Sequence, residues 1–153
     1  YVEGDSVNTI DPTGLGGYIL YGGAFELSQV DVEAGVVKPV LFEGLATDIS
    51  RDGTKLATVV SSEAGPAIVV MEIGTGEEEI YSVPNEFDQV GDATFNLDGS
   101  KVAYHTTITS AEPNVEETAV FVIDLATGEQ TEFDRQEGLY EIIWQDNDRP
   151  IVE

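Results

Sequence analysis

The feature that most constrains the fold is a unit of four short runs in Ala93–Glu132, separated by two glycine turns. The runs are rich in Val, Ile, Phe, Tyr and Thr, residue types that are enriched in β-strands. Asp98-Gly99 follows the first run and Thr127-Gly128 precedes the last. Glycine reaches the positive φ that tight hairpins require, so the unit predicts consecutive antiparallel strands.

The unit occurs more than once. Thr47–Tyr81 repeats it, with Asp52-Gly53 and Thr75-Gly76 at the two turn positions. Asn8–Val40 is a weaker copy, and Glu141–Val152 is the first half of another. The period of roughly 40 to 50 residues is that of four-stranded propeller blades.

We therefore expect an all-β fold of four-stranded antiparallel sheets, forming about three and a half β-propeller-type blades in one domain. The expected boundaries are blades at 8–45, 46–90 and 91–138 and a half-blade at 139–153. One copy cannot bury its own apolar faces, so the copies are expected to stack. The polar, acidic segment Thr109–Thr118 has no periodicity and is expected to be an exposed loop.

The segments Ser50–Ala57 (SRDGTKLA) and Val122–Glu129 (VIDLATGE) resemble the TolB-type, WD40-like PD40 propeller repeat. A blade of that family reads SPDGKxIAF and then LYVxDLxTGE. Here Ser50-Arg51 and Asn96-Leu97 stand where the family has Ser-Pro. The resemblance implies a β-propeller, a fold that hosts many unrelated activities.

The net charge of −24, from 30 acidic and 6 basic residues, restricts the environment and partners. Salt shortens the Debye length from about 10 Å at 0.1 M to about 3 Å at 1 M and so relieves such self-repulsion. We interpret the chain as salt-adapted (halophilic); an acidic secreted protein and a Ca²⁺-collecting surface are the alternatives. Nucleic acid and anionic membranes are disfavoured because phosphate binding needs clustered Lys and Arg.

Cysteine is absent, which excludes disulfides and thiolate chemistry. No run reaches the roughly 20 apolar residues of a membrane-spanning helix, so membrane insertion is not expected. The sequence begins at Tyr1 without a signal peptide, which indicates a processed form or part of a longer chain. We expect an extracellular or cell-surface location and leave the cytoplasm open.

Few residues suggest chemistry. His105 is the only histidine and is interpreted as an ordinary strand residue, because no serine or zinc-site pattern accompanies it. Asp146 and Asp148 resemble the start of a calcium loop, but Arg149-Pro150 interrupts the motif. We interpret them as turn residues and weak Ca²⁺ candidates; a loosely bound Ca²⁺ or Na⁺ is the alternative to no cofactor.

No catalytic residue is expected, since 30 carboxylates allow no pair to be assigned from sequence. Incomplete blades would leave apolar faces and strand edges open. The remainder of a longer chain, a ring of copies or an open filament would each cover them. The expected interaction residues are Tyr1, Val2, Ile142, Trp144 and Ile151.

The function expected from the sequence is a non-catalytic propeller module for interaction or scaffolding that assembles with itself through split terminal blades. The alternative is the regulatory propeller segment of a prolyl-oligopeptidase-like serine peptidase. A calcium-dependent sugar binder, with Trp144 as an aromatic platform, is a third option.

Overall fold

The computed structural model describes residues 9–10, 18–22, 25–31, 33–84, 86–87, 89–109, 116–138 and 141–152. All helices and strands assigned within these residues are β-strands, and every strand pair is antiparallel. The described part of the chain forms three four-stranded sheets and one two-stranded sheet. This arrangement confirms the predicted all-β class.

Each sheet is built from strands that follow one another along the chain. The first sheet comprises β1 (Thr9–Ile10), β2 (Tyr18–Gly22), β3 (Leu27–Asp31) and β4 (Val36–Val40). The second comprises β5 (Leu45–Ile49), β6 (Lys55–Ser62), β7 (Gly65–Glu72) and β8 (Glu78–Ser82). The third comprises β9 (Gln89–Phe95), β10 (Lys101–Thr109), β11 (Glu116–Asp124) and β12 (Gln130–Glu137). The last is the hairpin of β13 (Ile142–Trp144) and β14 (Pro150–Val152).

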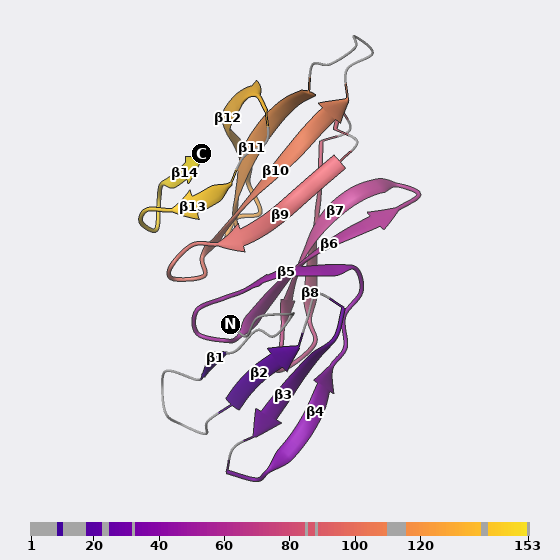
Figure 1. The fold of residues 1–153 in the computed structure, drawn as a ribbon, viewed down its shortest axis with the longest axis vertical. Helices are drawn as coiled ribbons and strands as arrows, with labels where there is room; N and C mark the ends of the chain where they lie inside the picture. Colours follow the sequence, from indigo (N-terminus) through magenta and orange to yellow (C-terminus); the bar gives the residue numbers. More distant parts are fainter. Residues whose placement is uncertain are drawn as a thin grey trace.

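The sheets succeed one another along the long axis of the molecule. Figure 1 shows the first sheet at the lower end, the third at the upper end, and the β13–β14 hairpin beside the third sheet. This modular order is the one that the sequence repeat predicts.

The predicted Asp-Gly turns join the first two strands of the second and third sheets. Gly53 has a φ of 74°, a conformation that L side chains rarely adopt. The buried side chain that opens each turn also caps it. Ser50 Oγ accepts the N–H of Lys55 at 2.9 Å, and Asn96 Oδ1 accepts the N–H of Lys101 at 2.9 Å. A side-chain acceptor at this position therefore closes each turn although no proline follows it.

The second turn is also repeated. In each four-stranded sheet, the glycine before the last strand donates its N–H at 2.8 Å to the carbonyl four residues earlier: Gly35 to Asp31, Gly76 to Glu72 and Gly128 to Asp124. The same backbone geometry thus recurs in all three sheets, as expected of one repeated unit.

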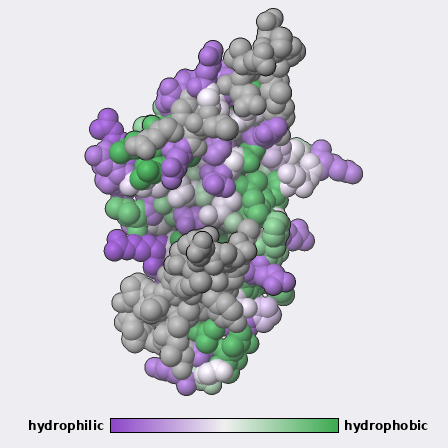
Figure 2. All heavy atoms as spheres, in the orientation of Figure 1, coloured by the Kyte–Doolittle hydropathy of each residue, from purple (hydrophilic) through white to green (hydrophobic). Residues whose placement is uncertain are grey.

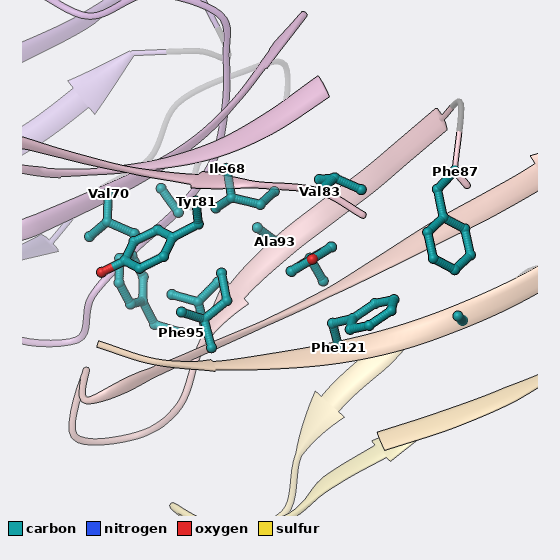
Figure 3. Close-up of a cluster of buried hydrophobic side chains, with 13 residues drawn as sticks. Ile68, Val70, Tyr81, Val83, Phe87, Ala93, Phe95 and Phe121 are labelled. Carbon is teal, nitrogen blue, oxygen red and sulfur yellow. The ribbon is translucent and has the colours of Figure 1, made fainter. Parts of the chain in front are cut away.

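The main core lies between the second and third sheets. Figure 3 shows Tyr81 and Phe95 among side chains that converge from both sheets. The rings of Tyr104 and Phe121 stack with centroids 5.5 Å apart, and Phe87 meets Phe121 edge-on at 5.5 Å. Burying each large apolar side chain contributes about 1.5–3 kcal/mol, so this interface holds the two sheets together. A smaller cluster around Leu27, Leu56 and Met71 joins the first and second sheets.

The expectation of a loop at Thr109–Thr118 is wrong at both ends. Thr109 pairs with Glu116, and Thr107 pairs with Thr118, so β10 and β11 continue into this segment. Thr118 is fully buried. Backbone pairing with a long neighbouring strand satisfies the peptide groups here, and it outweighs the low β-propensity of the polar sequence. The centre of the segment, 110–115, lies outside the described residues.

Candidate interaction site

The β13–β14 hairpin begins a fourth blade. Its turn is closed by a hydrogen bond from the N–H of Gln145 to the carbonyl of Arg149 at 3.1 Å. Asp146 Oδ1 accepts the N–H of Asp148 at 2.8 Å. Asp148 Oδ1 in turn accepts a hydrogen bond from Lys101 Nζ at 2.5 Å. In the described structure the two weak Ca²⁺ candidates therefore serve the turn and its attachment to the third sheet.

Further polar contacts fix this hairpin on the third sheet. Trp144 Nε1 donates to the carbonyl of Thr94 at 3.1 Å. Asn96 Nδ2 donates to the carbonyl of Asn147 at 2.8 Å, and Asn147 Oδ1 accepts the N–H of Asp98 at 2.9 Å. The hairpin is thus attached to the third sheet at strand β9 and at the Asp98-Gly99 turn.

The hairpin has a covered face and an open face. Ile142 and Trp144 are half-buried. Ile143 pairs with Ile151, and these two side chains are 44% and 38% exposed. Figure 2 shows apolar residues over β13, at the upper left, bordered by hydrophilic ones. Ile143 and Ile151 thus form a small exposed apolar pair on the open face of the hairpin.

The sequence pattern predicts only part of this region. Tyr1 and Val2, two of the expected interaction residues, lie outside the described residues. Val122 and Phe133, which line a groove on the third sheet, are not among the expected interaction residues. Phe133 is the repeat counterpart of Tyr81, but the sequence does not distinguish the two, because exposure depends on the strands that lie over each residue.

The groove lies beside the hairpin and has a volume of about 350 Å³. Phe133 within it is 45% exposed, whereas Tyr81 at the same position of the second sheet is 7% exposed. The side chains that line the groove are Lys101, Val122, Asp124, Glu129, Thr131, Glu132, Phe133 and Asp148.

A second hollow, of about 420 Å³, lies at the inner strands. It is lined by Asp48, Asp92, His105 and Glu141, among others. Burial raises the pKa of Asp48, and hydrogen bonds from Phe95 and other groups partly offset the effect. Burial lowers the pKa of His105, against the opposing field of Asp92. His105 stands in β10, as the sequence predicts.

These acidic groups do not form a metal centre in the described part of the chain. There, no group of three or more His, Cys, Asp and Glu side chains is arranged to hold a metal ion. The described residues also contain no helix long and apolar enough to cross a membrane.

No protein-family model and no curated protein matches the chain in sequence. Solved structures do match it in fold. The β-propeller domain of the Trilobed protease from Pyrococcus furiosus, described as having an open velcro topology, superposes on 99% of the chain with a TM-score of 0.59 and 15% identity. The chain folds as a partial β-propeller.

Two further structures are similar to the propeller. Pyrococcus horikoshii acylaminoacyl peptidase matches 89% of the chain, with a TM-score of 0.65 and 16% identity. TolB from Agrobacterium tumefaciens matches 87%, with a TM-score of 0.58 and 18% identity. The chain spans 49%, 26% and 50% of the Trilobed, acylaminoacyl peptidase and TolB chains, respectively. At these identities the similarity establishes the fold, and the TolB match agrees with the repeat resemblance.

Proposed function

We propose that this propeller is a non-catalytic interaction module that binds protein through its incomplete fourth blade. The observation that carries the proposal is the β13–β14 hairpin, whose open face exposes Ile143 and Ile151. Within the described residues β14 pairs only with β13, whereas the second strand of each other sheet pairs on both sides. An edge with backbone groups free to pair, beside apolar side chains, is a site for strand addition.

In the simplest form of the proposal the protein assembles with itself. The fourth blade of one copy is completed by the amino-terminal residues of another, with Tyr1 and Val2 in contact with the hairpin. This assembly operates at high ionic strength, because a net charge of −24 on each copy opposes contact in dilute buffer. The setting that we propose is the surface or exterior of a salt-adapted cell.

The experiment is a mass measurement by light scattering in about 2 M KCl, where a Debye length below about 3 Å screens the repulsion. We expect the wild-type chain to form a dimer or larger assembly and the Ile143→Asp/Ile151→Asp variant to be monomeric. Ile80→Asp is the matched control, since Ile80 is 66% exposed on β8, away from the hairpin. A wild-type chain that stays monomeric at every salt concentration would refute self-assembly.

A second candidate function is the regulatory propeller of a serine peptidase. The fold similarity to the acylaminoacyl peptidase and to the Trilobed protease domain favours it. Reading the native coding sequence tests it. A G-x-S-x-G segment between a strand and a helix in the same polypeptide would support this role, because that motif positions a nucleophilic serine.

A further inference from the structure

The pairing of β9 with β10 is irregular at His105. The register shifts there, so that two residues of β9, Gly91 and Asp92, lie opposite this single residue of β10. Two residues that oppose one form a β-bulge, which bends the strand and aims side chains in a new direction. The bulge therefore sets how the imidazole ring of His105 lies against β9.

The ring of His105 occupies the place that a side chain at position 91 would take. A Cβ built on Gly91 would lie 1.8 Å from Nε2 and 2.1 Å from Cε1 of the ring. Gly91 does not have a positive φ, so its backbone conformation is one that other residues adopt as well. The absence of a side chain at Gly91 therefore serves the contact with the imidazole ring.

The same ring borders the hollow of about 420 Å³ at the inner strands. Carboxylates from three elements line this hollow: Asp48 on β5, Asp92 on β9 and Glu141 just before β13. Asp92 and Glu141 are exposed, and neither makes an ion pair with another described residue. The lining includes no lysine or arginine, so a protonated His105 would be its one cation.

On its other flank His105 pairs with the uncharged Val120 of β11. Asp134 of β12 pairs with Val120 in turn and so lies two strands away from His105.

Protonation changes the balance of forces on the ring. Burial lowers the pKa of His105, against the opposing field of Asp92, so the ring is neutral at about pH 7 where it packs on Gly91. The stability of this packed position is fully present above about pH 6.5 and is lost as the pH falls below that value. An imidazolium gains instead from the nearby carboxylates of the hollow, because opposite charges attract strongly where water is partly excluded.

We propose that His105 is a pH-sensitive contact: when protonated, its ring leaves Gly91 and turns into the hollow, where the carboxylates of Asp92 and Glu141 pair with it. Because Glu141 leads directly into β13, protonation ties the β13–β14 hairpin to β10. This inference goes beyond the proposed function, since it concerns how a mildly acidic medium changes the fold within one chain. It uses only groups of β9, β10 and the segment that precedes β13.

The chain supplies a reporter on each side of this contact, because His105 is its only histidine and Trp144 its only tryptophan. Trp144 is half-buried on β13. The test titrates the protein between about pH 8 and pH 5 at fixed ionic strength. NMR follows the imidazole signal and its nuclear Overhauser contact with the Hα protons of Gly91, and fluorescence follows Trp144.

We expect the contact with Gly91 to be present when His105 is neutral and to be lost when it is protonated. The fluorescence of Trp144 should change with the same midpoint, and this change should be absent in His105→Gln.

Variants of the two carboxylates separate this contact from an ordinary structural histidine. Asp92→Asn should weaken proton binding by His105 about threefold or more, because the imidazolium loses a neighbouring opposite charge. Glu141→Gln should reduce the fluorescence change of Trp144 about twofold or more, because the hairpin loses its link to the ring. Glu78→Gln is the matched control, since it removes one exposed carboxylate on the outer strand β8 and should leave both titrations unchanged.

A ring that keeps its contact with Gly91 after protonation would overturn the proposal. So would a fluorescence transition that persists in His105→Gln, or equal effects of Asp92→Asn and Glu78→Gln on the titration of His105. The NMR measurement uses the wild-type chain, so it decides the question even if a variant fails to fold. Neither readout depends on self-assembly, so a negative result would leave the proposed function standing.

Discussion

Asp48 on β5 and Phe95 on β9 join the second and third sheets, with Asp48 Oδ2 accepting the N–H of Phe95 at 2.7 Å. The same oxygen accepts the hydroxyl of Thr94 at 3.1 Å, while Oδ1 accepts the N–H of Ile49 at 2.8 Å. One partly buried carboxylate therefore accepts hydrogen bonds from its neighbour Ile49 on the second sheet and from Thr94 and Phe95 on the third sheet, which are 46 and 47 residues away in sequence.

We predict that Asp48→Ala destabilises the protein by about 1–3 kcal/mol, because the N–H of Phe95 would lose its acceptor inside an interface. Urea unfolding in concentrated KCl measures the change. Asp92→Ala is the control, since Asp92 is an exposed carboxylate on β9. If both variants lose the same free energy of unfolding, the loss comes from removing a charge and not from breaking the link between the sheets.

Asp48 also predicts a pH dependence. Burial raises the folded-state pKa of Asp48 above the ordinary value of an aspartate side chain. Its stabilising contribution is therefore fully present below the unfolded-state pKa and is lost as the pH rises through the folded-state pKa. We expect the unfolding free energy of the wild type, relative to Asp48→Asn, to be larger at pH 4 than at pH 7. A difference that does not change with pH would contradict the raised pKa.

Gly91 and His105 provide a steric prediction. A Cβ at Gly91 would lie 1.8 Å from Nε2 of His105, which requires the ring to move. We expect Gly91→Ala to cost about 1–3 kcal/mol, as overpacking in a filled site does. In a His105→Ala background, Gly91→Ala should lower the free energy of unfolding much less than it does in the wild type. A double-mutant cycle with no coupling would show that the ring does not occupy this place in solution.

Two buried hydroxyls predict a gain in stability. Among the described residues, Oγ1 of Thr106 and Oγ1 of Thr118 are buried without a hydrogen-bond partner. Thr106→Val keeps the shape and removes the unsatisfied group, so we expect a gain of about 1 kcal/mol. Thr94→Val is the contrast, because the Thr94 hydroxyl donates to Asp48 and its removal should destabilise. A loss in both variants would show that the Thr106 hydroxyl has a partner in solution.

The acidic surface predicts a strong response to salt. We expect the melting temperature to rise by several degrees between about 0.1 M and 2 M KCl, because screening weakens repulsion among carboxylates. Replacing Glu77, Glu78 and Glu79 with glutamine should reduce the rise. CaCl₂ at the same ionic strength should raise the melting temperature no more than KCl does. A larger rise with calcium would indicate a specific calcium site instead.

The local units of the fold could be predicted because their causes are local. Asp52-Gly53 and Asp98-Gly99 open hairpins through φ and through contacts made within a few residues. The ends of β10 and β11 could not be predicted from the sequence. Their polar residues pair with a neighbouring strand, and the position of that strand depends on the whole sheet. The role of Phe133 was equally hidden, since exposure depends on which strands lie over it.

The sequence by itself determined the strand pattern, the glycine turns, the repeat and the acidic charge, since each follows from residue type and spacing. Only the tertiary structure decided which faces are covered. It made Tyr81 a core residue and left Phe133 open in a carboxylate-lined groove, although the two occupy the same position in the repeat. Burial is a property of the neighbouring sheet, and no residue carries that information alone.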